Sequence, residues 1–442
     1  MGNTVLRRKM TDYLRSWRNT HKNECLLING ARQVGKSFVV NEFGTSDYQH
    51  FITLDFVAHP EYKEIFTGSL DADAITSRMS LYIPSARFVP HETLIFLDEI
   101  QECPQARTAL KYLAQDGRYD VIASGSLLGL RFREMKDAPS LPVGYERQVT
   151  MHPLDFEEFL WAHGYEPTAI GLLREHFNQL EPLENGINER MMRLFKEYLV
   201  IGGMPDVVQQ YVDSGNFSVA HDAQTQLHRL YLDDIARYAS PTERVKARSC
   251  YLSLPRQLAK ENTRFSYATV EKGGRARKFD GSVDWLVGAE IVQRCQAVSS
   301  ATYPLTAYED NSRFRLYAND TGLLFAMHDF SLKAAVVDNT LSGPMKGGLY
   351  ENLIACTLAS KDIPLRYWIS SDTKHEIEFL IDWQGAVVPV EVKAGRGSTA
   401  SLNRMLERND IPLGYKLIVG NVGHDGKKVT LPLWMAMFLF ER

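Results

Sequence analysis

The chain has 442 residues, of which 44% are hydrophobic and 24% are charged, and its formal net charge is −4. This length predicts two or three domains, and the composition is typical of a soluble folded protein rather than of a disordered chain. The negative balance excludes a uniformly basic nucleic-acid coat, so nucleic-acid binding would need a local basic patch.

The cysteines and the apolar runs indicate the compartment. The five cysteines lie far apart with no close pair, which fits neither a disulfide framework nor a zinc site and favours a reducing environment. No signal-type apolar core follows the N-terminus, and the longest apolar runs, such as PLWMAMFLF, are too short to span a bilayer. The sequence therefore predicts a cytoplasmic protein with no membrane partner.

The first predicted site lies between the strand-like run Cys25 to Ile28 and the helix-like SFVVNEF, where GARQVGKS fits G-x-x-x-x-G-K-[ST]. Backbone amides of such a loop face phosphates, and the following helix directs its positive end at them. We expect Lys36 to reach the β and γ phosphates of ATP and Ser37 to bind Mg²⁺. The alternative is a glycine turn that happens to hold a lysine and a serine. The predicted nucleotide-binding residues are Gly30, Ala31, Arg32, Gln33, Val34, Gly35, Lys36, Ser37 and Phe38.

The apolar run TLIFLDEI ends in two acids, at the position where an open α/β sheet presents its ligands. Asp98 is predicted to hold Mg²⁺, and Glu99 is predicted to polarise the attacking water. Two acids at a strand end can also belong to a solvated loop, but the preceding motif favours the catalytic interpretation.

The next apolar run, DVIASGSLLGL, places Ser124 at a strand end, where its hydroxyl could contact the γ-phosphate or the water. A simple turn is the alternative. Arg131, Arg133 and Arg147 are candidates for a positive charge supplied to a neighbouring subunit, although most surface arginines have no such role. Strand-like runs near residues 25, 51, 93, 120 and 148 alternate with helical stretches, which predicts a parallel sheet covered on both faces.

These motifs, together with LIFLDEIQECP, SLPVGYERQVTMHPLDFEEFL and YLVIGGMPDVV, resemble bacterial and archaeal AAA-type ATPases whose C-terminal half is a domain of unknown function. The resemblance continues through LYANDTGLL, GGLYENLIA and EIEFLIDWQGAVVPVEVKAG and covers nearly the whole chain. It implies an α/β protein with a P-loop AAA-like ATPase core, a helical lid, a winged-helix segment and a C-terminal α/β domain resembling restriction endonucleases. The implied boundaries are 1–152, 153–240, 241–335 and 336–442.

The residues of the expected lid and winged-helix segments carry signals of their own. Asp155 and Glu158 have capping-box spacing at the start of a lid helix. Further on, a helix-turn-helix pattern contains a basic cluster. DNA binding is the functional hypothesis for this cluster. The alternatives are that it is a solvent-exposed face or a surface that docks against the ATPase module. The four candidate DNA contacts are Lys272, Arg275, Arg277 and Lys278.

Near the C-terminus, RYWISSDTKHEIEFLIDWQGAVVPVEVKAG predicts three strands joined by turns, and Glu391 and Lys393 share one strand face. Paired acids with a lysine suit Mg²⁺-dependent phosphodiester cleavage. The resemblance places Glu378, Glu391 and Lys393 at the positions of the PD-(D/E)XK nuclease motif, and Glu351 could add a further oxygen. Glu378 replaces the usual aspartate, and Asp382 is a possible substitute. We favour a retained fold whose acids serve packing or partner recognition, since fold does not imply function.

Three functions follow from the sequence. The first is an ATPase that couples nucleotide turnover to DNA or to a protein partner. The second is a nucleotide-dependent interaction switch with little turnover, and the third is an ATP-regulated, Mg²⁺-dependent nuclease. Whether the chain works as a monomer or as a ring stays open.

Overall fold

The structure is a computed structural model that describes residues 5–21, 23–125, 144–261, 263–370, 372, 375–395 and 399–441. Its contacts divide the chain into an N-terminal unit, Arg7–His152, and a C-terminal unit that consists mainly of Pro153–Arg442. Within the described residues, no helix combines the length and the apolarity that crossing a bilayer requires.

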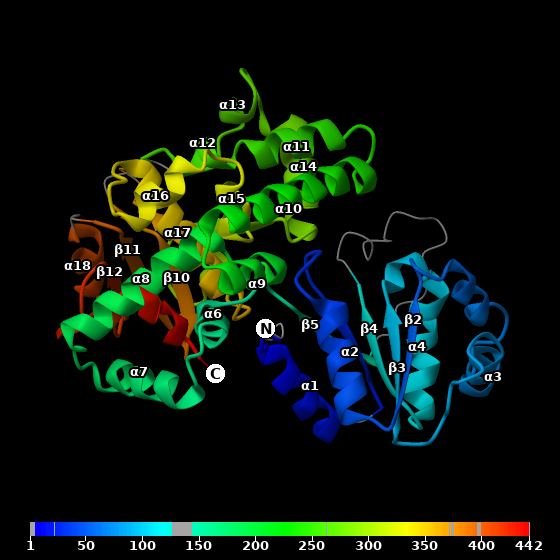
Figure 1. Cartoon of the computed structure of the whole chain (residues 1–442). Coiled ribbons are helices and arrows are strands. Elements are labelled where there is room, and N and C mark those ends of the chain that lie inside the picture. Colours follow the sequence, from blue (N-terminus) through cyan, green and yellow to red (C-terminus); the bar gives the residue numbers. More distant parts are fainter. Residues whose placement is uncertain are drawn as a thin grey trace. The chain divides into compact units, whose positions relative to one another are not determined.

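The N-terminal unit is a five-stranded parallel sheet with the strand order β2-β3-β4-β1-β5. Helices lie on both faces of this sheet, as the alternation in the sequence predicts (Figure 1). The elements are α1 (Lys9–Thr20), β1 (Cys25–Asn29), α2 (Lys36–Asp47), β2 (His50–Asp55), η1 (Pro60–Phe66), α3 (Ala72–Tyr82), β3 (Thr93–Asp98), η2 (Ile100–Glu102), α4 (Pro104–Asp116), β4 (Asp120–Ser124) and β5 (Glu146–Thr150).

The burial of each strand follows its place in this sheet. Every residue of β1 and β3 is buried, because these strands have neighbours on both sides and helices on both faces. β5 lies at an edge, and its sequence, ERQVT, is polar and partly exposed. Cys25 and Leu27 of β1 pack with η1, α3 and α4 in one hydrophobic core. Because all five strands run parallel, their carboxyl ends share one edge of the sheet.

The C-terminal unit begins with helices and ends in two sheets. Its helical part consists of α6 (Phe156–Ala162), α7 (Pro167–Gln179), α8 (Asn185–Ile201), α9 (Pro205–Ser214), α10 (Phe217–Tyr238), α11 (Arg244–Leu252), α12 (Leu254–Leu258), α13 (Tyr267–Val270) and α14 (Ala276–Gly288). α6 starts with the predicted capping box: Asp155 accepts a hydrogen bond from Glu158 N, and Glu158 accepts one from Asp155 N.

The rest of this unit mixes strands and helices. It consists of β6 (Val292–Val298), η4 (Leu305–Tyr308), β7 (Glu309–Ala318), α15 (Thr321–Phe325), α16 (Ser331–Val337), α17 (Pro344–Ala359), β8 (Arg366–Ile369), β9 (Glu376–Ile377), β10 (Phe379–Trp383), β11 (Ala386–Lys393), α18 (Ala400–Leu406), β12 (Gly414–Ile418), β13 (Gly423–Asp425), β14 (Lys428–Pro432) and η5 (Leu433–Phe438). One sheet has the order β7-β6-β8-β9, and the other has the order β10-β11-β12-β14-β13.

The middle strand of the three predicted near the C-terminus is divided at Glu378 into β9 and β10. The division has a physical reason, because β9 pairs with β8 in one sheet and β10 pairs with β11 in the other. The same four-stranded sheet joins β6 and β7, from the segment expected to be a winged helix, to strands of the segment expected to resemble a nuclease.

Candidate functional site

The loop between β1 and α2 is held in a conformation that two glycines allow. Gly35 precedes α2 with φ 93° and ψ 21°, in the left-handed region. Gly30 has φ 150°, and a Cβ atom there would lie 2.3 Å from the carbonyl oxygen of Met151. Because a side chain at either position would be strained, the loop keeps its backbone bare on the side that would face a ligand.

Lys36 is a buried cation of this loop that is held by hydrogen bonds. Its side chain is 7% exposed, and its Nζ donates hydrogen bonds of 2.9 Å to the carbonyl oxygens of Gly30 and Ala31. No acidic residue lies in the first turn of α2, and Gly35 provides no side-chain cap. The first amides of α2 therefore have no side-chain acceptor, and a buried ammonium group lies on the same loop, a combination that suits an anion.

Arg8, which is far from this loop in sequence, forms hydrogen bonds with it. It is 5% exposed, its Nη1 donates to the carbonyl oxygen of Val34 at 2.8 Å, and its Nη2 donates to that of His152 at 2.6 Å. Arg8 belongs to no motif and was not predicted from the sequence. It ties the P-loop to the residue at which the N-terminal unit ends.

Asp98 is the buried acid at the carboxyl end of β3. It is 5% exposed, and it accepts hydrogen bonds from the Ser124 hydroxyl and, at 3.1 Å, from Glu99 N. Burial raises the pKa of Asp98, while hydrogen bonds from Ser124 and Ser37 oppose that shift. The pairing of β4 with both β1 and β3 brings Ser37, Asp98 and Ser124 together from three segments of the chain.

Glu99 has an unusual backbone. Its φ of 54° and ψ of 48° lie in the left-handed region, which costs a residue with a side chain about 1 kcal/mol or more. The side chain of Gln101 donates from Nε2 to Glu99 Oε2, and Gln101 is 8% exposed. The sequence analysis did not single out Gln101, although it lies only two residues beyond Glu99.

Asp55 is a third acid at this edge that the sequence analysis missed. It ends β2 and is paired with Asp98 in the register of the two strands, so its charge contributes to the raised pKa of Asp98. Its Oδ1 accepts hydrogen bonds from Val57 N and Ala58 N at 2.8 and 2.9 Å. The signal that could have identified Asp55 is its position at the end of β2, the strand next to β3.

The remaining predicted loop residues differ in exposure. Val34 is fully buried, Arg32 is half-buried, and Gln33 is exposed with φ 65°. Phe38 is 54% exposed on α2.

Of the three candidate arginines, Arg131 and Arg133 lie outside the described residues. Arg147 lies opposite Leu26 in the pairing of β5 with β1, and its Nε is 2.7 Å from Glu24 Oε1. Glu24 precedes β1, whereas the P-loop follows it, so Arg147 pairs at the end of the sheet away from the P-loop of its own chain.

In the C-terminal unit, Lys393 lies between two of the predicted acids. Its Nζ is 2.7 Å from Glu378 Oε1 and 3.6 Å from Glu391 Oε1. Burial raises the pKa of Glu391 to about 7 and also raises the pKa of Glu378, although Lys393 opposes both shifts. Burial by itself would lower the pKa of Lys393, but the two carboxylates raise it. The three side chains form one ion-pair cluster in which Glu391 is buried and the other two are partly exposed.

Glu351 of α17 is engaged by other groups. Its Oε1 accepts hydrogen bonds from Arg315 Nη1 at 2.7 Å, from Thr263 at 3.3 Å and from the Tyr317 hydroxyl. Arg315, which is fully buried, also bonds Glu376. Within the described part of the chain, no three His, Cys, Asp or Glu side chains gather closely enough to hold a metal ion.

Asp382, the alternative to Glu378, has a different partner. Its two carboxylate oxygens lie 3.2 and 3.1 Å from Leu305 N, whose amide hydrogen bond they accept at the start of η4. This side chain therefore holds η4 and forms no ion pair with Lys393 among the described residues.

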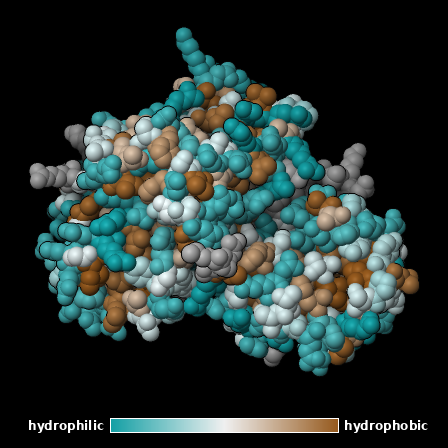
Figure 2. Space-filling view, in the orientation of Figure 1, coloured by the Kyte–Doolittle hydropathy of each residue, from teal (hydrophilic) through white to brown (hydrophobic). Residues whose placement is uncertain are grey.

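The basic cluster surrounds the start of α14, and its four members, Lys272, Arg275, Arg277 and Lys278, are all exposed. Lys278 pairs with Glu271 at 2.6 Å, whereas no described residue forms an ion pair or hydrogen bond with the side chains of the other three cations. The tip above α13 is hydrophilic in Figure 2. Cations in the first turn of a helix interact unfavourably with the helix dipole. An anionic partner would relieve this repulsion.

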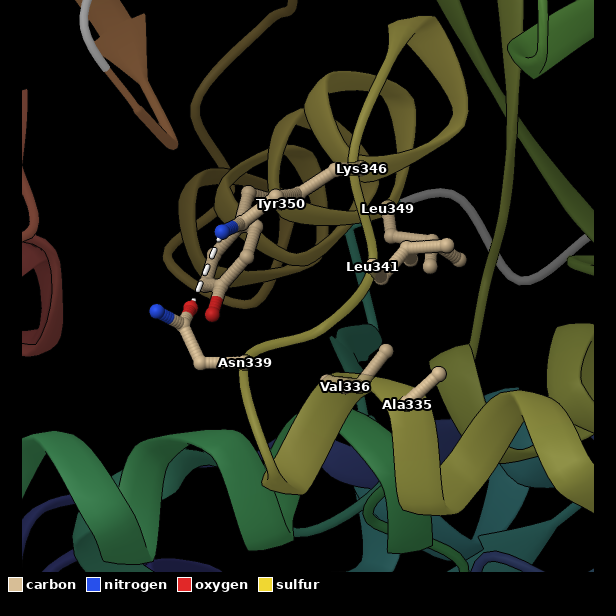
Figure 3. A pocket seen from close by; sticks show the side chains of 7 residues that line it. All are labelled: Ala335, Val336, Asn339, Leu341, Lys346, Leu349 and Tyr350. Carbon is tan, nitrogen blue, oxygen red and sulfur yellow. Dashed lines mark hydrogen bonds between the residues drawn. The ribbon is translucent and has the colours of Figure 1, made fainter.

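A small pocket lies between α16 and α17 (Figure 3). Lys346 Nζ donates to Asn339 Oδ1 at 2.9 Å across its mouth. The pocket is lined by Ala335, Val336, Asn339, Leu341, Lys346, Leu349 and Tyr350. Its lining is mostly apolar. Burial raises the pKa of Tyr350 to about 12, so this phenol stays protonated near neutral pH.

Comparison with known proteins gives three partial family matches: an AAA domain over residues 22–160, a domain of unknown function (DUF8612) over residues 192–334 and another (DUF4143) over residues 346–431. No curated protein matches the chain. Similar solved structures include a Walker-type ATPase of Pyrococcus abyssi, with 13% identity and a TM-score of 0.42, covering 73% of this chain and 96% of that one. They also include the ORC1 protein of Aeropyrum pernix in complex with DNA, with 11% identity, a TM-score of 0.29 and coverage of 76% and 93%. AMPPCP-bound DnaA from Aquifex aeolicus has 12% identity, a TM-score of 0.28 and coverage of 62% and 86%.

Proposed function

We propose that this chain hydrolyses ATP at the carboxyl edge of its N-terminal sheet, where the P-loop, Asp98, Glu99 and Ser124 lie. The premise is that residues 22–160 form an AAA-type P-loop ATPase domain that binds ATP. One observation carries the proposal. The hydroxyls of Ser37, next to the P-loop lysine, and of Ser124 both bond the Asp98 carboxylate at the carboxyl end of one parallel sheet.

The residues present fit a nucleotide triphosphate. The bare glycine backbone and the uncapped start of α2 suit the phosphates. Phosphate oxygens would take the place of the Gly30 and Ala31 carbonyls as acceptors for Lys36.

Ser37 and Asp98 fit Mg²⁺, because both supply hard oxygen ligands and already contact each other. When bound, Mg²⁺ neutralises charge on the β and γ phosphates. Ser124 holds the orientation of Asp98 through its hydroxyl.

Glu99 accepts a hydrogen bond from the attacking water and then its proton. The water oxygen forms a bond to the γ-phosphorus, and the bond from that phosphorus to the β–γ bridging oxygen breaks, giving ADP and phosphate. Lys36 offsets the negative charge that accumulates on the leaving oxygens.

Steady-state ATP hydrolysis with Mg²⁺ tests this proposal. Glu99→Gln should lower kcat about 100-fold or more, because the base is lost, while ATP still binds. Glu64→Gln, an exposed change in the same unit, is the matched control and should hydrolyse ATP like the unchanged protein. Equal rates for Glu99→Gln and the control would refute the assignment.

We further propose that turnover is coupled to DNA through the basic cluster, with α11 to α14 and the β6–β7 hairpin acting as a winged helix. The three unpaired exposed cations at the start of α14 support it. Arg275→Ala with Arg277→Ala should reduce the slope of log affinity against log salt by about 2. The control removes two other exposed cations, Arg193 and Arg229, as alanine variants. DNA affinity and salt slope equal to those of the control would leave a protein partner as the coupling target.

A nuclease is the second candidate, and we propose that the acid–lysine cluster instead stabilises the fold. Glu351 is bound to Arg315, and Lys393 forms ion pairs with both Glu378 and Glu391, which supports a structural role. One observation favours the nuclease: Glu391 is 1% exposed, and its Oε2 has no hydrogen-bond partner among the described residues. Mg²⁺-dependent nicking of plasmid DNA that Lys393→Ala abolishes, without loss of folding, would establish the nuclease.

A further inference from the structure

We propose that Gln101 is a positioning residue that holds the carboxylate of Glu99 ready to take the proton of the attacking water. The proposal rests on the ATPase function proposed above and adds to it a residue outside the P-loop and the strand-end acids. Gln101 acts through Glu99 and has no contact with the nucleotide in this assignment.

The side-chain contact is the first support. Gln101 lies in η2, directly after the strand that carries Asp98, and it is 8% exposed. Its Nε2 donates a hydrogen bond to Glu99 Oε2. Which end of the amide faces Glu99 is fixed by chemistry, since an ionised carboxylate only accepts and the amide nitrogen is the only donor of the side chain.

The backbone of Glu99 is the second support. Its amide donates to Asp98 Oδ1 at 3.1 Å, and its carbonyl accepts from Glu102 N at 2.9 Å. The left-handed conformation directs the chain sharply away from β3. The main chain of Glu99 is therefore fixed on both sides, and the bond from Gln101 adds a restraint on one carboxylate oxygen, leaving Oε1 for the water.

The carbonyl end of Gln101 is the third support. Its Oε1 is buried and accepts no hydrogen bond from any described residue. A buried acceptor without a donor is disfavoured, and a bound water is the smallest donor that satisfies it. Gln101 would thus donate to Glu99 and accept from a bound water other than the attacking one, so that its amide is held from both ends and keeps the Glu99 carboxylate in place.

The first experiment compares Gln101→Ala with Gln105→Ala, an exposed change on α4. Gln101→Ala should lower kcat about 10- to 100-fold, as expected when a reacting group is misplaced. The Kd of a non-hydrolysable ATP analogue should change less than about twofold, because the P-loop is untouched. Gln105→Ala should match the unchanged protein in both.

Gln101→Glu keeps the shape of the side chain and supplies the discriminating pH profile. At pH 8 this variant places a second ionised carboxylate beside Glu99 and lacks the amide donor, so kcat should be low. As the pH falls, one proton is shared between the two acids and restores a donor to Glu99, so kcat should recover, whereas the unchanged protein shows no such rise. Thermal unfolding with and without the analogue checks folding at each pH.

Combination with Glu99→Gln separates this proposal from the ATPase proposal. Because Gln101 acts through Glu99, adding Gln101→Ala to Glu99→Gln should not lower the single-turnover rate further. If Glu99→Gln hydrolyses ATP at the full rate, the ATPase assignment fails. If Glu99→Gln is slow but Gln101→Ala is fully active, or the two losses are additive, only the role of Gln101 is overturned.

Discussion

At the scale of the residue, the burial of Asp98 determines how its contribution to stability depends on pH. Burial raises its pKa, so the folded protein favours the protonated carboxyl. Its contribution to stability is therefore most favourable at low pH and is lost as the pH rises through the raised pKa. Once ionised, the carboxylate is buried, and the groups that bond it, the hydroxyls of Ser124 and Ser37 and the amide of Glu99, carry no positive charge.

We accordingly expect Asp98→Asn to raise the free energy of unfolding by about 1 kcal/mol at pH 7 without Mg²⁺, since replacing a functional residue commonly increases stability. The same substitution should abolish Mg²⁺-dependent ATP hydrolysis. Urea unfolding followed by circular dichroism at pH 7 and at pH 5 measures the difference. The gain should narrow as the pH falls, because the raised pKa of Asp98 means that the folded protein takes up a proton on this carboxyl more readily than the unfolded chain does. A variant that is less stable at pH 7 would show that hydrogen bonds to the carboxylate outweigh its burial.

At the scale of the element, α15 and the loop after α8 are joined by one side chain. Asp320 precedes α15, and its oxygens accept hydrogen bonds from Leu323 N at 2.9 Å and from Gly203 N at 2.6 Å. Gly203 must be glycine, because a Cβ atom there would lie 2.1 Å from Leu154 O. Burial raises the pKa of Asp320 to about 6, although these amide bonds lower it.

Asp320→Ala should lower the free energy of unfolding by about 3 kcal/mol, because it removes a helix cap and leaves buried amides without acceptors. Asp233→Ala, which removes an exposed aspartate from α10, should cost less than about 0.5 kcal/mol. Chemical denaturation of the two variants side by side measures the difference. Similar losses would mean that the amides find other acceptors.

At the scale of the whole molecule, all residues of the proposed nucleotide site belong to the N-terminal unit. Ligand that binds only the folded state should stabilise this unit by about 2.7 kcal/mol at 100 times its Kd. We expect a non-hydrolysable ATP analogue with Mg²⁺ to slow hydrogen exchange in peptides from the P-loop, β3 and β4. Mass spectrometry measures this protection.

Lys36→Ala is the control for this measurement, since it removes the cation of the P-loop and should eliminate the protection at the same ligand concentration. Protection that survives the substitution would show that the analogue binds elsewhere. Protection of the loop after α8 in the unchanged protein would show that nucleotide binding is transmitted to the C-terminal unit.

The sequence by itself determined the features that local patterns encode. The alternation of buried runs and helices predicted the parallel sheet, and the AAA-type ATPase domain is confirmed by the family match over residues 22–160. The spacing of Asp155 and Glu158 predicted the capping box that starts α6. Such signals are readable because a cap or a strand involves residues close together in the chain.

Only the tertiary structure decided which distant groups meet. Arg8 contacts carbonyls 26 and 144 residues away, and no local pattern marks a residue that binds backbone oxygens. The pairing of β6 with β8 crosses a boundary drawn from the sequence, since strand pairing leaves no trace in either strand alone. Gln101 meets Glu99 only because Glu99 adopts a left-handed backbone, a conformation that its residue type disfavours and that the surrounding fold imposes.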